Sequence, residues 1–85
     1  MLSSEFSSSA EKFLKKIDKD LARRIIEKIE KLIEDPFPKD AKRVMNQKEK
    51  IFRVRVGGYR IQYSVLYDKN LIFISDIDKR ARAYD

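Results

Sequence analysis

The 85-residue sequence contains no cysteine, no histidine and no tryptophan, and only two glycines and two prolines. Without cysteine the chain has neither a disulfide nor a thiolate nucleophile. Without histidine it lacks the usual general base and the usual metal ligand, so Ser–His and Cys–His mechanisms are excluded. A zinc site would have carboxylates alone as ligands. Any catalysis by this chain therefore has to rest on electrostatics and positioning.

Long hydrophobic runs are also missing. The longest run has four residues, 71–74, which is far too short to cross a membrane. Residues 1–13 lack the apolar stretch of a signal peptide. We therefore expect a cytoplasmic protein with no membrane partner. The length predicts one small domain that spans residues 1–85.

Positive charge is concentrated in the second half of the chain. Residues 1–40 contain nine Lys or Arg and nine Asp or Glu, whereas residues 41–85 contain eleven and five, so the whole net charge of +6 lies there. Six of these cations are arginines, whose planar guanidinium groups grip phosphate and carboxylate. Because aromatic residues are interleaved with them, they indicate a nucleic-acid or acidic protein partner. The alternative is a charge surplus that serves solubility only.

The first half has the hydrophobic spacing of two amphipathic helices. Apolar residues recur every three or four positions between residues 10 and 33, which is typical of helices that bury one side. Ser8 followed by Glu11 is a capping-box pattern, and it predicts a helix start at about residue 9. The stretch 18–20 holds two N-cap candidates. We expect helices over about 8–17 and 20–34, with one long bent helix as the alternative.

From residue 51 onward the hydrophobic period changes to two. The segments are rich in β-branched and aromatic residues, and strands are expected over 51–56, 59–67 and 71–77, with short strands at 2–6 and 43–45. Gly57-Gly58 is a hairpin signal, and Asp68-Lys69-Asn70 is a weaker one. The fold class is therefore α+β, with two N-terminal helices packed on one face of a small antiparallel β-sheet.

A two-residue loop at Gly57-Gly58 determines which side chains share a face of the sheet. It places Arg55 opposite Arg60, and Arg53 opposite Gln62, on the face away from the helices. Like charges directly opposite each other destabilise a sheet, and an anion bound between them would relieve the repulsion. The alternative is that the long side chains splay apart into water. We expect a polyanion site on this face.

The C-terminal residues are expected to extend this site. The last strand runs antiparallel to the one before it, so the residues after Ile77 come close to Arg60, and they include Lys79, Arg80, Arg82 and Tyr84. Aromatic side chains stack on unpaired RNA bases, and Tyr84 is the candidate for that role. Phe13, Phe52 and Phe73 are expected in the core from their spacing, and Tyr59 and Tyr63 from their place on the apolar face. Phe37 and Tyr67 remain unassigned.

Two amphipathic helices, the run FRVRVGGYRIQY at 52–63 and the ending KRARAY at 79–84 together resemble the RelE/ParE superfamily of toxins, and the RelE branch most closely. The resemblance covers nearly the whole chain and implies the RelE-like microbial ribonuclease fold. It also implies a ribosome-dependent endoribonuclease that cleaves mRNA in the A site. In that reaction the ribose 2′-OH attacks the neighbouring phosphate without a metal or cofactor, and translation stops. The implied partners are a RelB-like antitoxin and the ribosome with its mRNA, with promoter DNA reached only through the antitoxin.

The resemblance assigns roles residue by residue. Arg60 matches the family arginine that contacts the scissile phosphate, and Arg53 matches a basic position on the preceding strand. Arg80 matches a C-terminal arginine that stabilises the phosphate or leaving group, and Tyr84 matches a tyrosine that stacks on a base or moves a proton. A second family lysine falls on Ile51, so Lys48 or Lys50 would have to replace it. The expected phosphate-binding residues are Lys48, Lys50, Arg55, Lys79 and Arg82.

Two other functions remain open at this point. A ParE-like toxin would inhibit DNA gyrase without cutting RNA, and a catalytically inactive relative would only bind nucleic acid. The arginine cluster with Tyr84 favours the nuclease, because gyrase inhibition does not need a constellation of residues that cleaves phosphate esters.

Overall fold

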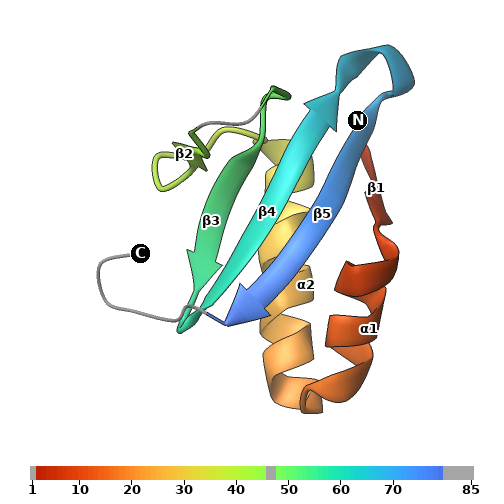
Figure 1. Cartoon of the computed structure of the whole chain (residues 1–85), viewed down its shortest axis with the longest axis vertical. Helices are drawn as coiled ribbons and strands as arrows, with labels where there is room; N and C mark the ends of the chain where they lie inside the picture. The colour runs from red at the N-terminus through yellow and green to blue at the C-terminus, as the bar shows by residue number, and fades with distance from the viewer. Residues whose placement is uncertain (1, 46–47, 80–85) are drawn as a thin grey trace.

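A computed structural model describes residues 2–45 and 48–79 of the chain. In chain order the elements are β1 (Ser3–Phe6), α1 (Ser8–Lys16), α2 (Lys19–Glu34), β2 (Lys42–Arg43), β3 (Phe52–Val56), β4 (Tyr59–Leu66), the 3₁₀ turn η1 (Tyr67–Lys69) and β5 (Leu71–Lys79). The five strands form one sheet in the order β1-β5-β4-β3-β2, and both helices lie behind it (Figure 1). None of the helices in the described part is long and apolar enough to span a membrane.

The α+β architecture predicted from the sequence is confirmed, with a correction to the sheet. Strands β2 to β5 pair antiparallel, but β1 lies parallel to β5, with Ser3 opposite Leu71. The first strand enters the sheet beside the last one, so no short hairpin sets its direction. The short strand predicted at 43–45 is found at Lys42–Arg43.

The helix break was predicted correctly, but the first cap was not. Asp18 caps α2 by accepting a hydrogen bond from the backbone N–H of Leu21 at 2.9 Å, so the single bent helix is wrong. Ser7, not Ser8, caps α1 and accepts from the N–H of Ala10 at 3.2 Å. The Ser7 hydroxyl also donates to the backbone oxygen of Ser75 at 2.9 Å. Ser7 therefore joins the start of α1 to β5, which a purely local capping rule does not register.

A β-bulge at Ser75 reconciles the sequence of β5 with a two-sided sheet. Ile72, Ile74 and Ile77 are at most 3 % exposed and all face the helices, although strict alternation would turn Ile77 to the opposite side. The register shifts between Gln62, which pairs with Asp76, and Tyr63, which pairs with Ile74. The extra residue restores the buried face and also fixes which acidic side chains lie opposite β4.

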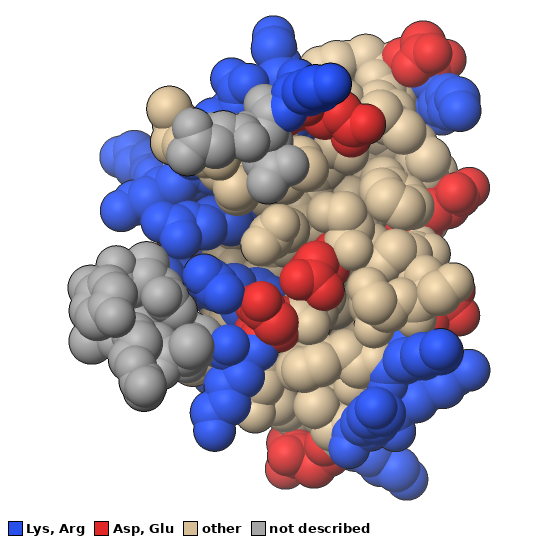
Figure 2. All heavy atoms as spheres, viewed as in Figure 1, with Lys and Arg blue, Asp and Glu red and all other residues tan. Residues whose placement is uncertain are grey.

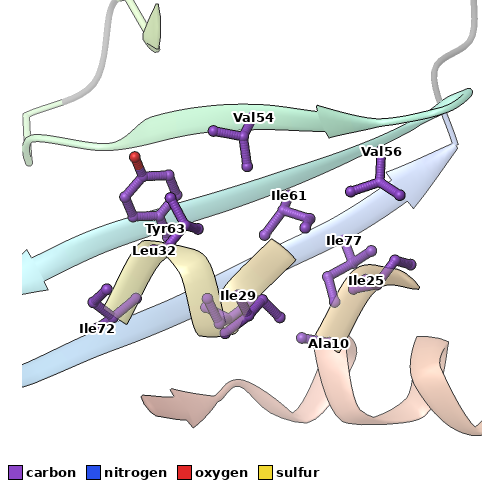
Figure 3. Packing of buried hydrophobic residues seen from close by; sticks show 11 residues of the cluster. Ala10, Ile25, Ile29, Leu32, Val54, Val56, Ile61, Tyr63, Ile72 and Ile77 are labelled. Carbon is purple, nitrogen blue, oxygen red and sulfur yellow. The ribbon is translucent and has the colours of Figure 1, made fainter. Parts of the chain in front are cut away.

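The core lies between the helices and the sheet, where Ile25, Ile29 and Leu32 of α2 meet inward-facing residues of β3, β4 and β5 (Figure 3). Fully buried Tyr63 donates a hydrogen bond from its hydroxyl to the backbone oxygen of Pro36 at 2.6 Å. Phe13 and Phe52 pack against this core as predicted. Phe73 does not, because it alternates with Ile72 and Ile74 and so lies on the other face.

Candidate nucleic-acid interface

The β3–β4 hairpin has the register predicted from Gly57-Gly58. Arg55 lies opposite Arg60 and Arg53 lies opposite Gln62. Gly57 has a φ of +59°, a left-handed conformation that glycine adopts without a steric penalty. The turn therefore places the three arginines on the sheet face that the helices leave uncovered.

Cations from three strands meet on this uncovered face. Lys42 of β2 lies opposite Arg53, so Lys42, Arg53, Arg55 and Arg60 share one side of the sheet, and we call these four residues the basic face. In Figure 2 the Lys and Arg side chains gather over β2 and β3, while uncharged residues cover much of the surface over β4 and β5. The side chains of directly opposed residues are about 5 Å apart at Cβ, which is close enough for two cations to share one anion.

A small hollow lies within the basic face. It has a volume of about 160 Å³ and is lined by Lys42, Arg53, Arg55 and Asp40. Lys28 of α2 donates to Asp40 across 2.8 Å, and this hydrogen bond lowers the pKa of the Asp40 carboxyl below its ordinary value. Because Lys28 is paired with Asp40, the aspartate does not offset the three cations that surround the hollow.

A larger hollow of about 400 Å³ lies on the outer side of α2 and has the opposite character. Its lining consists of Glu27, Glu30, Lys31 and Glu34. Three carboxylates repel a phosphate backbone, since like charges raise the energy of approach. By size alone, the hollow on α2 would be the better candidate for a binding site. Its acidic lining repels a polyanion, however, whereas the cations of the basic face attract one. The basic face is therefore the candidate site for a polyanion.

Arg60 has an anionic neighbour on the adjacent strand. Its Nε and Nη2 atoms donate to Oδ1 and Oδ2 of Asp78, both at 3.2 Å, and the two residues are directly paired across β4 and β5. The repulsion between Arg55 and Arg60, from which the sequence analysis inferred a bound anion, is therefore offset in part by a side chain of the protein. Asp78 supplies that carboxylate from the neighbouring strand β5.

The remaining predicted site residues fall into three groups. Lys79 pairs with Tyr59, whose ring packs on Phe13, so Lys79 alternates away from the basic face. Lys48 and Lys50 are exposed and precede β3, at the end of the strand remote from the Gly57-Gly58 turn. The expected roles of Arg80, Arg82 and Tyr84 concern residues outside the described part of the chain.

Lys42 is a residue on this face that the sequence analysis overlooked. The signal for Lys42 was weak, because a two-residue strand shows no alternation. The direct pairing of Asp78 with Arg60 depends on the bulge at Ser75. Among residues 2–45 and 48–79 there is no group of three or more acidic residues placed to hold a metal ion.

The fold and the basic face together define a small α+β protein with a cationic surface on the side of the sheet opposite the helices. The sequence matches the ParE toxin family of type II toxin–antitoxin systems over residues 5–84. The chain belongs to this family, and its likeness to RelE proteins makes it a RelE-like toxin. It is 41% identical to the RelE1 toxin candidate of Methanocaldococcus jannaschii over 73 residues, which span 78% of this chain and 80% of that protein.

Solved structures agree on the fold. The toxin fold in the archaeal RelE–RelB complex from Pyrococcus horikoshii OT3 superposes with a TM-score of 0.82 at 27% identity, covering 96% of this chain and 98% of that one. The isolated E. coli RelE toxin also gives a TM-score of 0.82, at 20% identity, covering 98% and 88% of the two chains. The RelE-like fold predicted from the sequence is thereby confirmed.

Proposed function

We propose that this toxin is a ribosome-dependent endoribonuclease that cleaves mRNA in the A site and so arrests translation. The observation that carries the proposal is the basic face, where Lys42, Arg53 and Arg55 line a hollow of about 160 Å³ and Arg60 lies directly opposite Arg55. The resemblance to RelE toxins supports the reaction type. In that reaction the ribose 2′-OH attacks the adjacent phosphorus, and the bond to the 5′-oxygen of the next nucleotide breaks to leave a 2′,3′-cyclic phosphate.

Electrostatics supply most of the catalysis in this proposal. The transition state is a phosphorane with two negative charges, and Arg60 and Arg53 contact its non-bridging oxygens. Preorganised donors of this kind are worth roughly 3–4 kcal/mol each when removed one at a time. Arg80 stabilises the phosphate or the leaving oxygen, and Tyr84 stacks on a base or moves a proton, as the family resemblance implies. No metal or other cofactor takes part.

Alignment of the 2′-OH with the phosphate supplies the rest. Neither a tyrosine nor an arginine is a strong base at neutral pH, so the toxin needs a substrate that is already held in the reactive geometry. The ribosomal A site provides that geometry for mRNA, and holding reactants in place removes a large part of a barrier. Free RNA is accordingly a poor substrate.

The proposed partner is a RelB-like antitoxin that neutralises the toxin. Support comes from the Pyrococcus structure, which is a RelE–RelB complex. Promoter DNA is reached only through the antitoxin. The proposed place of action is the cytoplasm, where ribosomes and mRNA meet, and residues 1–85 act as one toxin domain.

The test compares wild type with Arg60→Ala on ribosomes programmed with a defined mRNA. We expect codon-phased cuts by wild type and a rate lower by about 10²–10³-fold for the variant. Arg43→Ala is the matched control. Arg43 is an exposed arginine of the same basic half, but it pairs with Phe52 and so alternates to the other side of the sheet, and its removal should leave the rate unchanged.

Two results contradict the proposal. One is wild-type toxin that leaves ribosome-bound mRNA intact, and the other is equal cleavage by Arg60→Ala and wild type. If the toxin spared mRNA but inhibited supercoiling by gyrase, the ParE-like alternative would be favoured. That alternative is considered because the matched family is named for the ParE toxin.

A further inference from the structure

Arg60 and Asp78 form a bidentate ion pair on the uncovered side of the sheet. The Arg60 side chain is 20 % exposed and that of Asp78 is 39 % exposed. Side-on contact through Nε and Nη2 is the geometry in which a carboxylate matches the guanidinium fork. It fixes both the position and the plane of the arginine, which one hydrogen bond alone does not.

Arg60 stands between unlike neighbours. Arg55 lies opposite it on the β3 side, and Asp78 lies opposite it on the β5 side. The like charge on one side and the carboxylate on the other both direct the guanidinium towards β5. The carboxylate uses the Nε–Nη2 edge, so Nη1 points away from Asp78.

We propose that Asp78 is a positioning residue that holds Arg60 in the orientation in which it meets the scissile phosphate. This inference rests on the proposed ribonuclease function and deepens it. Asp78 does not touch the substrate, and it acts by limiting the rotamers of an otherwise flexible arginine. Preorganisation of a charged donor lowers the barrier because the donor need not reorient as charge develops.

The proposal predicts opposite effects on binding and on chemistry. Asp78 is an anion, so its carboxylate weakens the attraction of Arg60 for RNA while it improves the aim of Arg60. Asp78→Asn removes the charge but keeps the size of the side chain. We expect the maximal cleavage rate to fall about tenfold. The concentration of toxin that gives half the maximal rate should stay the same or fall by up to about threefold, the size of a partly exposed ion pair.

The experiment measures single-turnover cleavage of ribosome-bound mRNA at increasing concentrations of full-length toxin. Asp76→Asn is the matched control. Asp76 lies two residues earlier in β5 and pairs with Gln62, so its substitution removes the same charge from the same face of the sheet. Both parameters of that variant should stay within about twofold of wild type. Asp78→Glu restores the carboxylate and should recover part of the rate that Asp78→Asn loses.

Any one of the following three results would overturn the inference. An unchanged rate for Asp78→Asn removes the positioning role. Equal losses in Asp76→Asn and Asp78→Asn assign the effect to net charge. Weaker binding and slower cleavage together, with a lower melting temperature, make Asp78 a structural residue only.

A separate measurement keeps the inference distinct from the proposed function. If wild type cleaves no mRNA, the ribonuclease proposal fails, and the Nε–Hε resonance of Arg60 decides on Asp78. A restrained guanidinium gives slow hydrogen exchange in wild type and faster exchange in Asp78→Asn, together with equal or tighter binding of a 12-nucleotide RNA. The same exchange rate in both proteins overturns the positioning role.

Discussion

The two faces of the sheet are built from the same strands but obey different rules. The most deeply buried residues of the covered face are aliphatic side chains and Tyr63, most of them less than 4 % exposed, and they pack against the two helices. The uncovered face holds the basic face and the carboxylates of β5. Here the helices do not pack on the strands, and charged side chains of neighbouring strands lie opposite one another. Strand alternation assigns each residue to one face, so one set of strands supplies both the stability and the candidate site.

The difference between the two faces predicts which substitutions change stability and which change function. Burial of apolar area stabilises the fold, and a domain of this size has a thin core. Exposed or half-buried charges contribute little to folding. Changes on the covered face should therefore reduce stability, whereas changes on the basic face should reduce function and leave the fold intact.

Among these predictions, Leu32→Ala on the covered face is expected to reduce the free energy of unfolding the most. Leu32 is fully buried between α2 and the sheet, and a cavity at such a site costs about 2–5 kcal/mol. Urea denaturation of wild type and variant measures the loss. Arg55→Thr, an exposed position of β3 on the other face, should change the free energy of unfolding by under about 1 kcal/mol. Equal losses for the two variants would contradict the division between faces.

Much of the fold follows from the sequence because local and global signals agree. The helix break at Asp18, the three long strands and the Gly57-Gly58 register were all predicted, and each depends on spacing or turn chemistry within a few residues. The parallel placement of β1 was not predicted, because it is set by contacts with β5 almost 70 residues away. The cap at Ser7 was missed for the same reason, since the Ser7 hydroxyl also donates to the backbone oxygen of Ser75.

The candidate site was predictable only as far as alternation holds. Arg53, Arg55 and Arg60 fall on one face by simple counting from the turn. Asp78 does not, because counting from the pairing of Leu66 with Leu71 places Ile77, not Asp78, opposite Arg60. The bulge at Ser75 shifts the register by one residue and brings the carboxylate to the arginine. A one-residue shift reverses the face of everything beyond it, and a sequence gives little sign of where that occurs.

The second prediction tests the covered face by pH. Burial, reinforced by the charges of Asp40 and Asp35, raises the pKa of Tyr63 to about 12, against about 10 in the unfolded chain. The folded state therefore retains a proton that the unfolded state loses between pH 10 and 12. The contribution of Tyr63 to the free energy of unfolding is therefore complete below pH 10. As the pH rises towards 12, this contribution falls by roughly 2–3 kcal/mol.

Tyr63→Phe isolates this contribution because phenylalanine does not titrate. At pH 8 the variant should be less stable by about 1 kcal/mol, having lost the hydrogen bond to Pro36. That difference should shrink and then reverse as the pH approaches 12. Urea midpoints of both proteins at several pH values give the comparison, and a difference that stays constant with pH would refute the role of the buried hydroxyl.

The third and smallest prediction concerns the turn that fixes which residues belong to which face. Gly57 has a φ of +59°, whereas Gly58 lies outside the left-handed region and an added Cβ there meets nothing within 4 Å. Gly57→Ala should cost about 1–2 kcal/mol, because a Cβ is strained in that conformation, and Gly58→Ala is the matched control, expected within about 0.5 kcal/mol of wild type. Thermal unfolding measures both, and Gly57→Asn should lose less than Gly57→Ala because asparagine tolerates a positive φ better. If both alanine variants are equally stable, the turn does not hold the register, and the opposition of Arg55 and Arg60 must be maintained by the strands themselves.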